Sequence, residues 1–371
     1  MKMDSPIRGY LEGYYGKLLR WSERHQIIST LSELGLNSYF YAPKEDVLHR
    51  LHWRTPYEQS WRLSFNSFCT HATQSGVAVL AGIAPGLDFN FDQFEPDSDF
   101  GHLVAKAKQL LSDGADHVVV LWDDIDDTFP KNLQKLTEGK AHATVVNLLS
   151  KELGQPIFTV PRVYARDIKN KNQYREEFFA TLNVQNPVIL CGDAIVVSDT
   201  SVEQLQALAQ NKSHRVILWD NFYANDYCPR RLFVGPWTGR SKIDEYLLNP
   251  TGLPYTDQLL LTMASACHTS DNMHKAWEQT LKEFEVPTAF RALGDYFDTP
   301  VFGDRVELAT IDITINTAEA LEECLWKWKS PLAREWYPYL MSLKHDLALQ
   351  SKSLPEDRII KTQPAPLATT L

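Results

Sequence analysis

The stretch that decides the fold is His117-Val118-Val119-Val120-Leu121-Trp122-Asp123-Asp124-Ile125-Asp126-Asp127. A continuous apolar run, in which three consecutive residues are β-branched, leads directly into four carboxylates within five positions. Such a run is typical of a strand buried on both faces of a parallel sheet. Parallel sheets and barrels bind ligands at the carboxyl ends of their strands, so the carboxylates indicate a solvated pocket there.

Short apolar runs of this kind alternate with longer amphipathic runs from residue 6 to about residue 249. The predicted strands are 7–12, 38–42, 77–83, 117–122, 157–160, 188–191, 215–219 and 246–248. The helical patterns between them are 23–34, 56–75, 100–113, 140–153, 176–182 and 202–210. Eight strand-then-helix repeats over about 250 residues predict a (β/α)8 TIM-like barrel, with a doubly wound open sheet as the alternative.

Polar or glycine-containing signatures follow several of the predicted strands. They are Glu12-Gly13-Tyr14-Tyr15-Gly16, Tyr41-Ala42-Pro43-Lys44, Ala84-Pro85-Gly86-Leu87-Asp88, Asp123-Asp124, Pro161-Arg162-Val163-Tyr164 and Trp219-Asp220-Asn221. In a barrel all of these signatures meet on one rim. Their convergence, more than any single motif, indicates an enzyme.

The strand pattern stops at residue 250, which we expect to end the catalytic barrel of residues 1–250. Helical patterns follow at 258–267, 273–284, 317–328 and 332–349, and the last two are rich in Trp and Leu. They predict an appended helical region over residues 251–351, which could also pair with a second copy as a homodimer. Residues 352–371 contain three prolines and little periodicity, which is typical of a flexible tail.

Composition narrows the class of protein and of partner. The chain has 371 residues, 44% of them hydrophobic, and a formal net charge of -10. That charge argues against nucleic acid or an anionic membrane as the main partner. The amino terminus lacks the apolar region of a signal peptide, and the five cysteines are scattered, so we expect reduced thiols in a cytoplasmic protein.

The carboxylates after the central strand have more than one interpretation. Asp126 and Asp127 are typical of a solvated turn that caps a helix. The cluster Asp123–Asp127 could instead bind Mg²⁺ through carboxylate oxygens, as in a magnesium-dependent lyase or transferase. No phosphate-binding loop accompanies the cluster, and His49 and His52 lack an apparent third ligand, so we expect no metal and no other cofactor.

Glycoside hydrolysis is the third interpretation, because it needs a carboxylic acid that protonates the leaving oxygen. Two neighbouring aspartates cannot readily lie on opposite sides of a sugar ring as an ordinary retaining pair does. They suit the substrate-assisted variant, in which the 2-acetamido oxygen of the sugar is the nucleophile. One carboxylate then orients the amide N–H, and its neighbour protonates the leaving oxygen.

Six motifs give the sequence a resemblance to glycoside hydrolase family 84, the O-GlcNAcases and bacterial β-N-acetylglucosaminidases. They occur in the family's order between about residues 8 and 250, and they are Glu12-Gly13-Tyr14-Tyr15-Gly16, Asn37-Ser38-Tyr39-Phe40-Tyr41-Ala42-Pro43-Lys44, Pro85-Gly86-Leu87-Asp88, Asp123-Asp124-Ile125-Asp126, Trp219-Asp220-Asn221-Phe222-Tyr223-Ala224-Asn225-Asp226-Tyr227 and Arg231-Leu232-Phe233-Val234-Gly235-Pro236. The resemblance implies a TIM-like barrel and retaining, metal-free hydrolysis of terminal β-linked GlcNAc through an oxazoline intermediate.

The resemblance also implies a role for individual residues. Asp123 would orient and polarise the acetamido group, and Asp124 would be the general acid and later the base. Tyr164 would lie beside the acetamido oxygen, Trp219 would form the floor of the acetyl pocket and Cys191 would line it. The residues implied to bind the sugar hydroxyls and amide are Gly13, Lys44, Asn221, Asp226 and Asn249. Without the resemblance, each of these would be read as a turn, surface or core residue.

The sequence departs from the family pattern at Lys17-Leu18-Leu19, at Arg162-Val163 and near Cys191-Gly192. These positions line the predicted pocket walls, so they leave the aglycone open between a glycoprotein, a hyaluronan-like polymer and a cell-wall fragment. We expect a bacterial enzyme of the O-GlcNAcase type. A barrel that binds GlcNAc without hydrolysing it is the non-enzymatic alternative.

Overall fold

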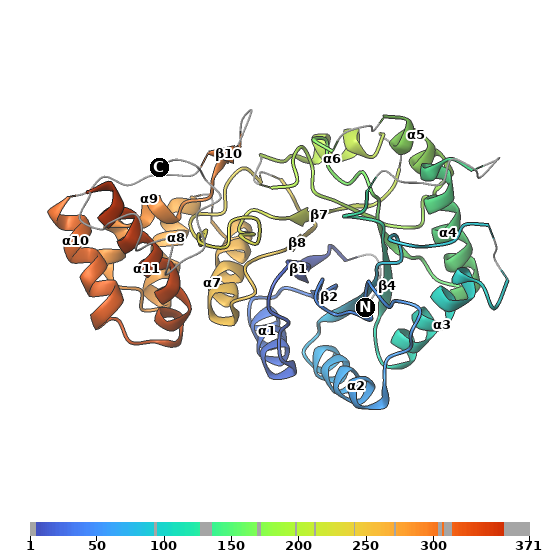
Figure 1. Ribbon diagram of the computed structural model, residues 1–371, viewed down its shortest axis with the longest axis horizontal. Coiled ribbons are helices and arrows are strands. Elements are labelled where there is room, and N and C mark those ends of the chain that lie inside the picture. Colours follow the sequence, from blue (N-terminus) through green and yellow to red (C-terminus); the bar gives the residue numbers. More distant parts are fainter. Residues whose placement is uncertain are drawn as a thin grey trace. The chain divides into compact units, whose positions relative to one another are not determined.

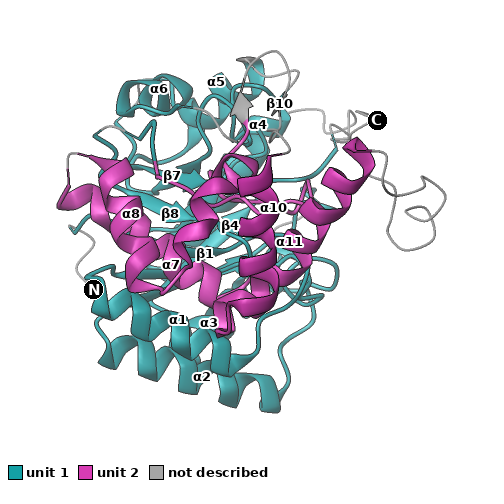
Figure 2. Ribbon diagram, turned by 90° about the vertical axis from the view of Figure 1, so that its left-hand side faces the viewer, with its two compact units in different colours: residues 1–221, 238–252 teal, residues 222–237, 253–371 magenta. Residues whose placement is uncertain are grey.

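A computed structural model describes residues 5–92, 95–126, 136–168, 172–196, 199–210, 213–240, 242–270, 272–302, 306–307 and 314–351. The chain divides into two compact units, one with residues 1–221 and 238–252, the other with residues 222–237 and 253–371 (Figure 2). The second unit thus includes a segment from within the predicted barrel sequence. The domain boundary predicted at residue 250 stays a prediction, and the predicted tail, residues 352–371, lies outside the described residues.

The first unit is a closed barrel of eight parallel strands in sequence order (Figure 1). The strands are β1 (Arg8–Glu12), β2 (Ser38–Tyr41), β3 (Ala78–Ile83), β4 (His117–Leu121), β5 (Phe158–Val160), β6 (Val188–Leu190), β7 (Val216–Asp220) and β8 (Tyr246–Leu248). β8 pairs with β1 and closes the barrel. The predicted (β/α)8 fold is confirmed, and the open-sheet alternative is wrong because an open sheet has two unpaired edges.

The central strand β4 shows why these residues form a barrel wall. It pairs with β3 on one side and with β5 on the other, and Val118, Val119 and Val120 are fully buried. β-Branched side chains suit a pleated surface that is covered on both faces. The Trp122 backbone N–H donates to the Val160 carbonyl at 2.9 Å, so backbone pairing reaches the residue directly before Asp123.

The outer layer of the barrel consists of amphipathic helices that follow the strands (Figure 1). They are α1 (Trp21–Glu33), α2 (Gln59–Gln74), α3 (Asp99–Ser112), α4 (Glu138–Leu153), α5 (Asn172–Thr181) and α6 (Val202–Leu208). No helix occurs among the described residues between β7 and β8. That segment contains Pro229, Pro236, Gly235 and Gly239, which disfavour a continuous helix there.

The second unit is mainly helical. Its elements are α7 (Pro254–Ser265), η1 (Ala266–His268), α8 (Met273–Glu283), η2 (Thr288–Ala292), α9 (Gly294–Phe297), β9 (Val301–Phe302), β10 (Val306–Glu307), α10 (Ile315–Glu322), η3 (Glu323–Lys327) and α11 (Pro331–Gln350). Trp336 is fully buried against Phe290 and Trp328, and its indole N–H donates to Thr256 Oγ1 at 3.0 Å.

Two features of the second unit differ from the sequence prediction. The helix predicted at 317–328 ends as an α-helix at Glu322 and continues as the π-helical turn η3. The short antiparallel pair of β9 and β10 was not predicted, because two-residue strands carry no detectable period. In the part of the chain that the structure describes, no helix has the length and hydropathy to cross a bilayer.

Candidate active site

The carboxyl ends of the barrel strands carry most of the predicted site residues. Each of these residues lies at or shortly after the end of a strand, in this order: Gly13 after β1, Lys44 after β2, Asp123 and Asp124 after β4, Tyr164 after β5, Cys191 after β6, Trp219 and Asn221 at the end of β7, and Asn249 after β8. A closed parallel barrel brings these ends to one rim.

The two aspartate carboxylates reach the same lysine because the backbone turns sharply between them. Successive side chains of a strand point to opposite faces. Asp124 instead has a φ of 53°, in the left-handed region that residues with a Cβ rarely adopt, although Asp tolerates it better than most. Leaving extended geometry at this residue lets both carboxylates reach the same cation.

That cation is Lys44, whose Nζ forms an ion pair with Asp123 Oδ2 and lies 3.2 Å from Asp124 Oδ2. The Lys44 and Asp123 side chains are only 2% and 4% exposed, whereas that of Asp124 is 28% exposed. Burial lowers the pKa of Lys44, but the two aspartate charges outweigh burial and raise the pKa above its usual value. Lys44 is therefore charged, and it holds the two carboxyl groups together.

Two tyrosines complete the surroundings of Asp124. Tyr164 donates from its hydroxyl to Asp124 Oδ1 at 2.8 Å, and Tyr15 donates to Asp124 Oδ2 at 2.9 Å. Burial raises the pKa of Asp124, but the charge of Lys44 and the hydrogen bonds from both tyrosines lower it below its usual range overall. Asp124 is therefore ionised in this geometry.

Asp123 has the opposite electrostatic balance. Burial raises the pKa of its carboxyl group, and the opposing charge of Lys44 does not cancel that effect. Its Oδ2 is held by Lys44, whereas its buried Oδ1 has no hydrogen-bond partner among the described residues. A buried acceptor without a donor is costly, so Oδ1 is suited to a donor supplied by a ligand.

A second group of predicted residues forms a chain of hydrogen bonds on another part of the rim. Gly13 N–H donates to Asn249 Oδ1 at 3.1 Å, and Asn249 Nδ2 donates to Asn221 Oδ1 at 2.8 Å. The same Asn221 oxygen accepts from Trp219 Nε1 at 2.8 Å. Asn221 Nδ2 donates to the Ile195 carbonyl at 2.7 Å, so the Asn221 side chain orients its neighbours.

Gly13 is required where it stands because the Trp219 ring lies against it. A Cβ at position 13 would be 2.6 Å from Trp219 Cζ2 and 2.9 Å from Cη2, far inside carbon–carbon contact distance. Lys44 Nζ lies 5.7 Å from the centroid of the Trp219 ring, which connects this group of residues to the carboxylates. The indole therefore lies between the glycine and the charged part of the site.

Tyr164 and Cys191 are connected through the backbone. Cys191 N–H donates to the Tyr164 carbonyl at 2.8 Å, and Ala165 pairs with Gly192 just beyond. The ends of β5 and β6 are thus fixed to each other. Cys191 is buried, and burial raises the pKa of its thiol well above its usual value, so the thiol is neutral.

The remaining residues considered in the sequence are three aspartates, Asp226, Asp126 and Asp127, and two histidines, His49 and His52. Asp226 belongs to residues 222–237 of the second unit, where its side chain is partly exposed. Asp126 is solvent exposed, and Asp127 lies outside the described residues. His49 is buried with Nδ1 2.9 Å from the Gly82 carbonyl, whereas His52 is exposed. The described residues contain no group of three potential metal ligands.

Two residues near Asp124 were not assigned a role from the sequence. Tyr15 belongs to the motif Glu12–Gly16 after the first strand, whereas Arg50 belongs to none of the motifs. Arg50 Nη1 donates to Tyr15 OH at 2.7 Å, and its Nη2 donates to the Asp124 backbone carbonyl at 2.5 Å. The available signal for Arg50 was the loop that it shares with Lys44, which it follows by six positions after the same strand.

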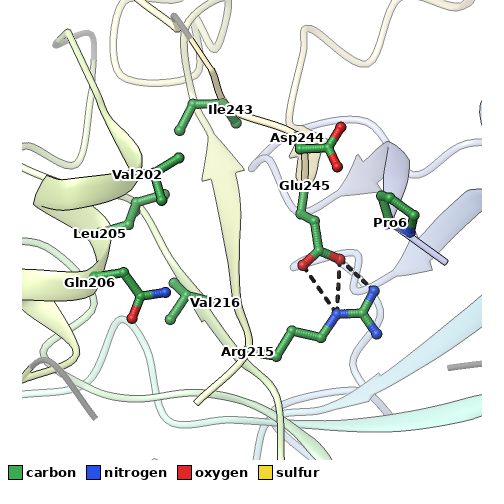
Figure 3. Close-up of a pocket in the computed structure, with 9 residues that line it drawn as sticks. All are labelled: Pro6, Val202, Leu205, Gln206, Arg215, Val216, Ile243, Asp244 and Glu245. Atoms are coloured by element: carbon green, nitrogen blue, oxygen red, sulfur yellow. Dashed lines mark hydrogen bonds and ion pairs between the residues drawn. The ribbon is translucent and has the colours of Figure 1, made fainter. Parts of the chain in front are cut away.

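An open pocket of about 430 Å³ lies at the other end of the barrel strands, where Arg215 and Glu245 immediately precede β7 and β8 (Figure 3). The Arg215 guanidinium faces the Glu245 carboxylate, with Nε donating to Oε1 at 2.8 Å. Much of the rest of the lining is apolar, including Val202, Leu205 and Ile243. With its main charges paired and at the amino ends of the strands, this pocket is not a candidate for catalysis.

Comparisons with known proteins show the family to which the sequence is similar. The model of the beta-N-acetylglucosaminidase family matches residues 8–297. Protein O-GlcNAcase of Mus musculus is 28% identical over 241 residues, which cover 63% of this chain and 26% of that protein. Protein O-GlcNAcase of Rattus norvegicus is 27% identical over 241 residues, with the same coverage. The chain thus spans about a quarter of the length of these relatives.

Solved structures show the same fold. A mutant of the O-GlcNAc hydrolase of Thermobaculum terrenum superposes with a TM-score of 0.71 at 22% identity, covering 79% of this chain and 66% of that one.

Proposed function

The chain belongs to the beta-N-acetylglucosaminidase family of glycoside hydrolases, and from that premise we propose that it removes terminal β-linked GlcNAc with retention of configuration. The proposed catalysis is substrate-assisted and passes through an oxazoline intermediate. Asp123 orients the 2-acetamido group, and Asp124 is the general acid and then the base. The observation that carries the proposal is the buried Asp123 Oδ1, which has no donor among the described residues.

In the first proposed step the acetamido N–H donates to Asp123 Oδ1 while Lys44 keeps the other oxygen in place. This hydrogen bond directs the acetamido carbonyl oxygen towards the anomeric carbon. The carbonyl oxygen forms a bond to that carbon as the glycosidic bond breaks, and Asp124 gives its proton to the leaving oxygen. Asp123 accepts the amide proton, which leaves a neutral oxazoline. Holding the reacting groups in contact makes an internal nucleophile effective without a protein nucleophile.

In the second proposed step a water molecule attacks the anomeric carbon of the oxazoline. Asp124, now a carboxylate, accepts the proton of that water as the bond between the acetamido oxygen and the anomeric carbon breaks. Asp123 returns the proton to the nitrogen, which restores the acetamido group. Two inversions at the same carbon give net retention. Tyr164 supports the carboxylate form of Asp124 in this step, because its hydroxyl donates to Oδ1.

Asp124 must be protonated before the first step, although the substrate-free geometry lowers its pKa. We propose that the substrate reverses this balance. A bound aglycone covers the exposed edge of Asp124, and burial raises the pKa of a carboxyl group. Sugar hydroxyls that accept hydrogen bonds from Lys44 compete with Asp124 for its ammonium group, which weakens the largest opposing effect.

The other predicted residues have supporting roles in the proposal. Trp219 forms the floor of the acetyl pocket against Gly13, and Asn249 contacts the sugar. Asn221 acts mainly through its hydrogen bonds to Trp219 and Asn249. Sugar binding by Asp226 and a homodimer through the helical region stay predictions. A cytoplasmic location also stays a prediction, with five free cysteines in its favour.

The magnesium-dependent alternative is less well supported by the charges at the site. Lys44 Nζ contacts both Asp123 and Asp124 and so occupies the place that a cation would take between them. A barrel that only binds GlcNAc would need no acid beside the orienting carboxylate.

The test compares an aryl β-N-acetylglucosaminide with an alkyl glycoside or an O-GlcNAc-modified protein. Asp124→Asn should lower turnover of the poor leaving groups by about 10²–10⁴-fold, the range for lost general acid catalysis. The activated aryl substrate should lose much less. Asp123→Asn should lower turnover of both substrates, because both need the acetamido nucleophile.

The matched control is Asp126→Asn, an exposed aspartate of the same stretch, which should behave like the wild type. A β-glucoside without the acetamido group should not be hydrolysed. Equal losses on both leaving groups would remove Asp124 from its proposed role, and wild-type rates for Asp123→Asn would remove Asp123.

A further inference from the structure

We infer that Arg50 is a positioning residue that holds Asp124 in its left-handed backbone conformation and orients its carboxylate through Tyr15. This inference rests on the proposed function, since it concerns the general acid of that reaction. Arg50 need not contact the substrate in this role. It acts on the reaction only through Asp124.

The contacts of Arg50 reach Asp124 by two routes. Nη2 donates to the Asp124 backbone carbonyl at 2.5 Å. Nη1 donates to Tyr15 OH at 2.7 Å, and that hydroxyl donates to Asp124 Oδ2 at 2.9 Å. One planar guanidinium therefore fixes the backbone directly and the side chain through one intermediate.

Asp124 needs such support because its φ of 53° is disfavoured for a residue with a Cβ. If the backbone relaxed towards extended geometry, the two neighbouring carboxylates would turn to opposite faces. Lys44 could then not contact both. A charged donor on the Asp124 carbonyl stabilises the turned conformation, since charge-assisted hydrogen bonds are stronger than neutral ones.

An arginine suits this place better than a lysine would. Its N–H groups point in fixed directions in one plane, so two acceptors can be held at once in a defined geometry. Tyr15 is also oriented by this contact, because its hydroxyl accepts from Arg50 and donates its own proton to Asp124. The hydrogen bonds thus run from the Arg50 guanidinium through the Tyr15 hydroxyl to the Asp124 carboxylate.

The arrangement crosses three loops of the rim, since Tyr15 follows β1, Arg50 follows β2 and Asp124 follows β4. Lys44 comes from the same loop as Arg50 and holds the Asp124 side chain at 3.2 Å. The loop after β2 therefore supplies two cations with separate tasks. Lys44 neutralises the carboxylates, and Arg50 sets their geometry.

The test measures kcat and KM of the wild type, Arg50→Met, Arg50→Lys and Tyr15→Phe on an aryl and an alkyl β-N-acetylglucosaminide. Arg50→Met should lower kcat on the alkyl substrate by about 10–100-fold, since an acid displaced by about 1 Å loses up to that much. It should lower kcat on the aryl substrate by less than about threefold, because an activated leaving group needs little acid catalysis. Arg50→Lys should recover part of the alkyl activity, and Tyr15→Phe should lose less than Arg50→Met.

The decisive arm repeats Arg50→Met in the Asp124→Asn background. If Arg50 acts through Asp124, the second substitution should change alkyl turnover by less than about twofold, because the group that it positions is already inactive. An undiminished loss in this background would mean that Arg50 acts on the substrate directly and would overturn the inference.

The matched control is Arg54→Met, from the same loop, which loses its bonds to Asp88 and Asp99 without touching Asp124. It should be less stable to heat but should show no difference between the two leaving groups. If Arg50→Met does not fold, Arg50→Lys and Tyr15→Phe give the same comparison. An inactive wild type would overturn the proposed function itself. An active wild type with unaffected Arg50 variants would overturn only the role of Arg50.

Discussion

Replacing Gly13 by alanine tests the packing between the first strand and the proposed acetyl pocket. The new Cβ would be 2.6 Å from Trp219 Cζ2, whereas carbon atoms normally approach to about 3.5–4.0 Å. The indole must therefore retreat by about 1 Å. The Gly13 backbone is tied to Asn249 by its N–H, and the indole N–H is tied to Asn221, so neither can move without losing a hydrogen bond.

Overpacking of this kind costs about 1–3 kcal/mol of the free energy of unfolding. In a domain of this size, about 1 kcal/mol lowers Tm by about 2–4 °C, so Gly13→Ala should lower Tm by about 2–12 °C. If Trp219 forms the pocket floor, a displacement of about 1 Å should also lower kcat/KM by about 100-fold. Thermal unfolding and hydrolysis of an aryl β-N-acetylglucosaminide measure the two effects.

Gly294→Ala is the matched control, because a Cβ there meets no atom within 4 Å. It should leave Tm and kcat/KM unchanged. Trp219→Phe removes the two ring carbons that clash, so the double variant Gly13→Ala with Trp219→Phe should lose less stability than the sum of the single variants. Strict additivity, or a wild-type Tm for Gly13→Ala, would refute the reasoning.

Three further predictions follow from the charges of the first unit. Asp220→Ala should lower the free energy of unfolding by about 3–5 kcal/mol, because it removes the carboxylate that lies 2.7 Å from the buried Arg240 guanidinium and balances its charge. Urea unfolding measures this loss, and Asp220→Leu combined with Arg240→Met should recover most of it. Burial raises the pKa of Glu23, but hydrogen bonds led by Arg20 lower it overall to about 2. The ionised Glu23 therefore stabilises the fold above the unfolded pKa of about 4.3, and this stabilisation is lost as the pH falls towards 2. Glu23→Gln should be less stable than the wild type at pH 7 and equal to it near pH 2, and a pH-independent difference would contradict this. Excess EDTA should leave hydrolysis unchanged, since Lys44 already lies between the two carboxylates; a loss of activity that Mg²⁺ restores would count against that view.

The barrel fold could be predicted from the sequence because it follows from patterns of apolar residues within short segments. Short apolar runs such as residues 117–121 can be buried on both faces only as strands of a covered parallel sheet, and amphipathic runs of helical length separate them. The ends of elements shifted by a few residues, as at α5, which begins at Asn172 although its pattern begins at residue 176. Ends depend on caps and on neighbouring elements, which a periodic pattern does not contain.

The position of the two neighbouring aspartates could also be predicted from the sequence, because carboxylates directly after a buried strand must lie at its carboxyl end. The sequence could not show how the pair is held. The bond from Tyr15 to Asp124 spans 109 positions, that from Arg50 spans 74, and that from Lys44 to Asp123 spans 79. Each of them depends on which loops the closed barrel brings together.

Features that depend on short-range interactions could therefore be predicted from the sequence, whereas features that depend on long-range interactions required the tertiary structure. Apolar periodicity within about ten residues determined the strands, the helices and the rim on which the polar residues meet. Only the tertiary structure decided the left-handed turn at Asp124, the hydrogen bond from Asn249 to Asn221 and the grouping of residues 222–237 with the helical unit. These features arise from contacts between distant segments, whose geometry no local pattern of side chains encodes.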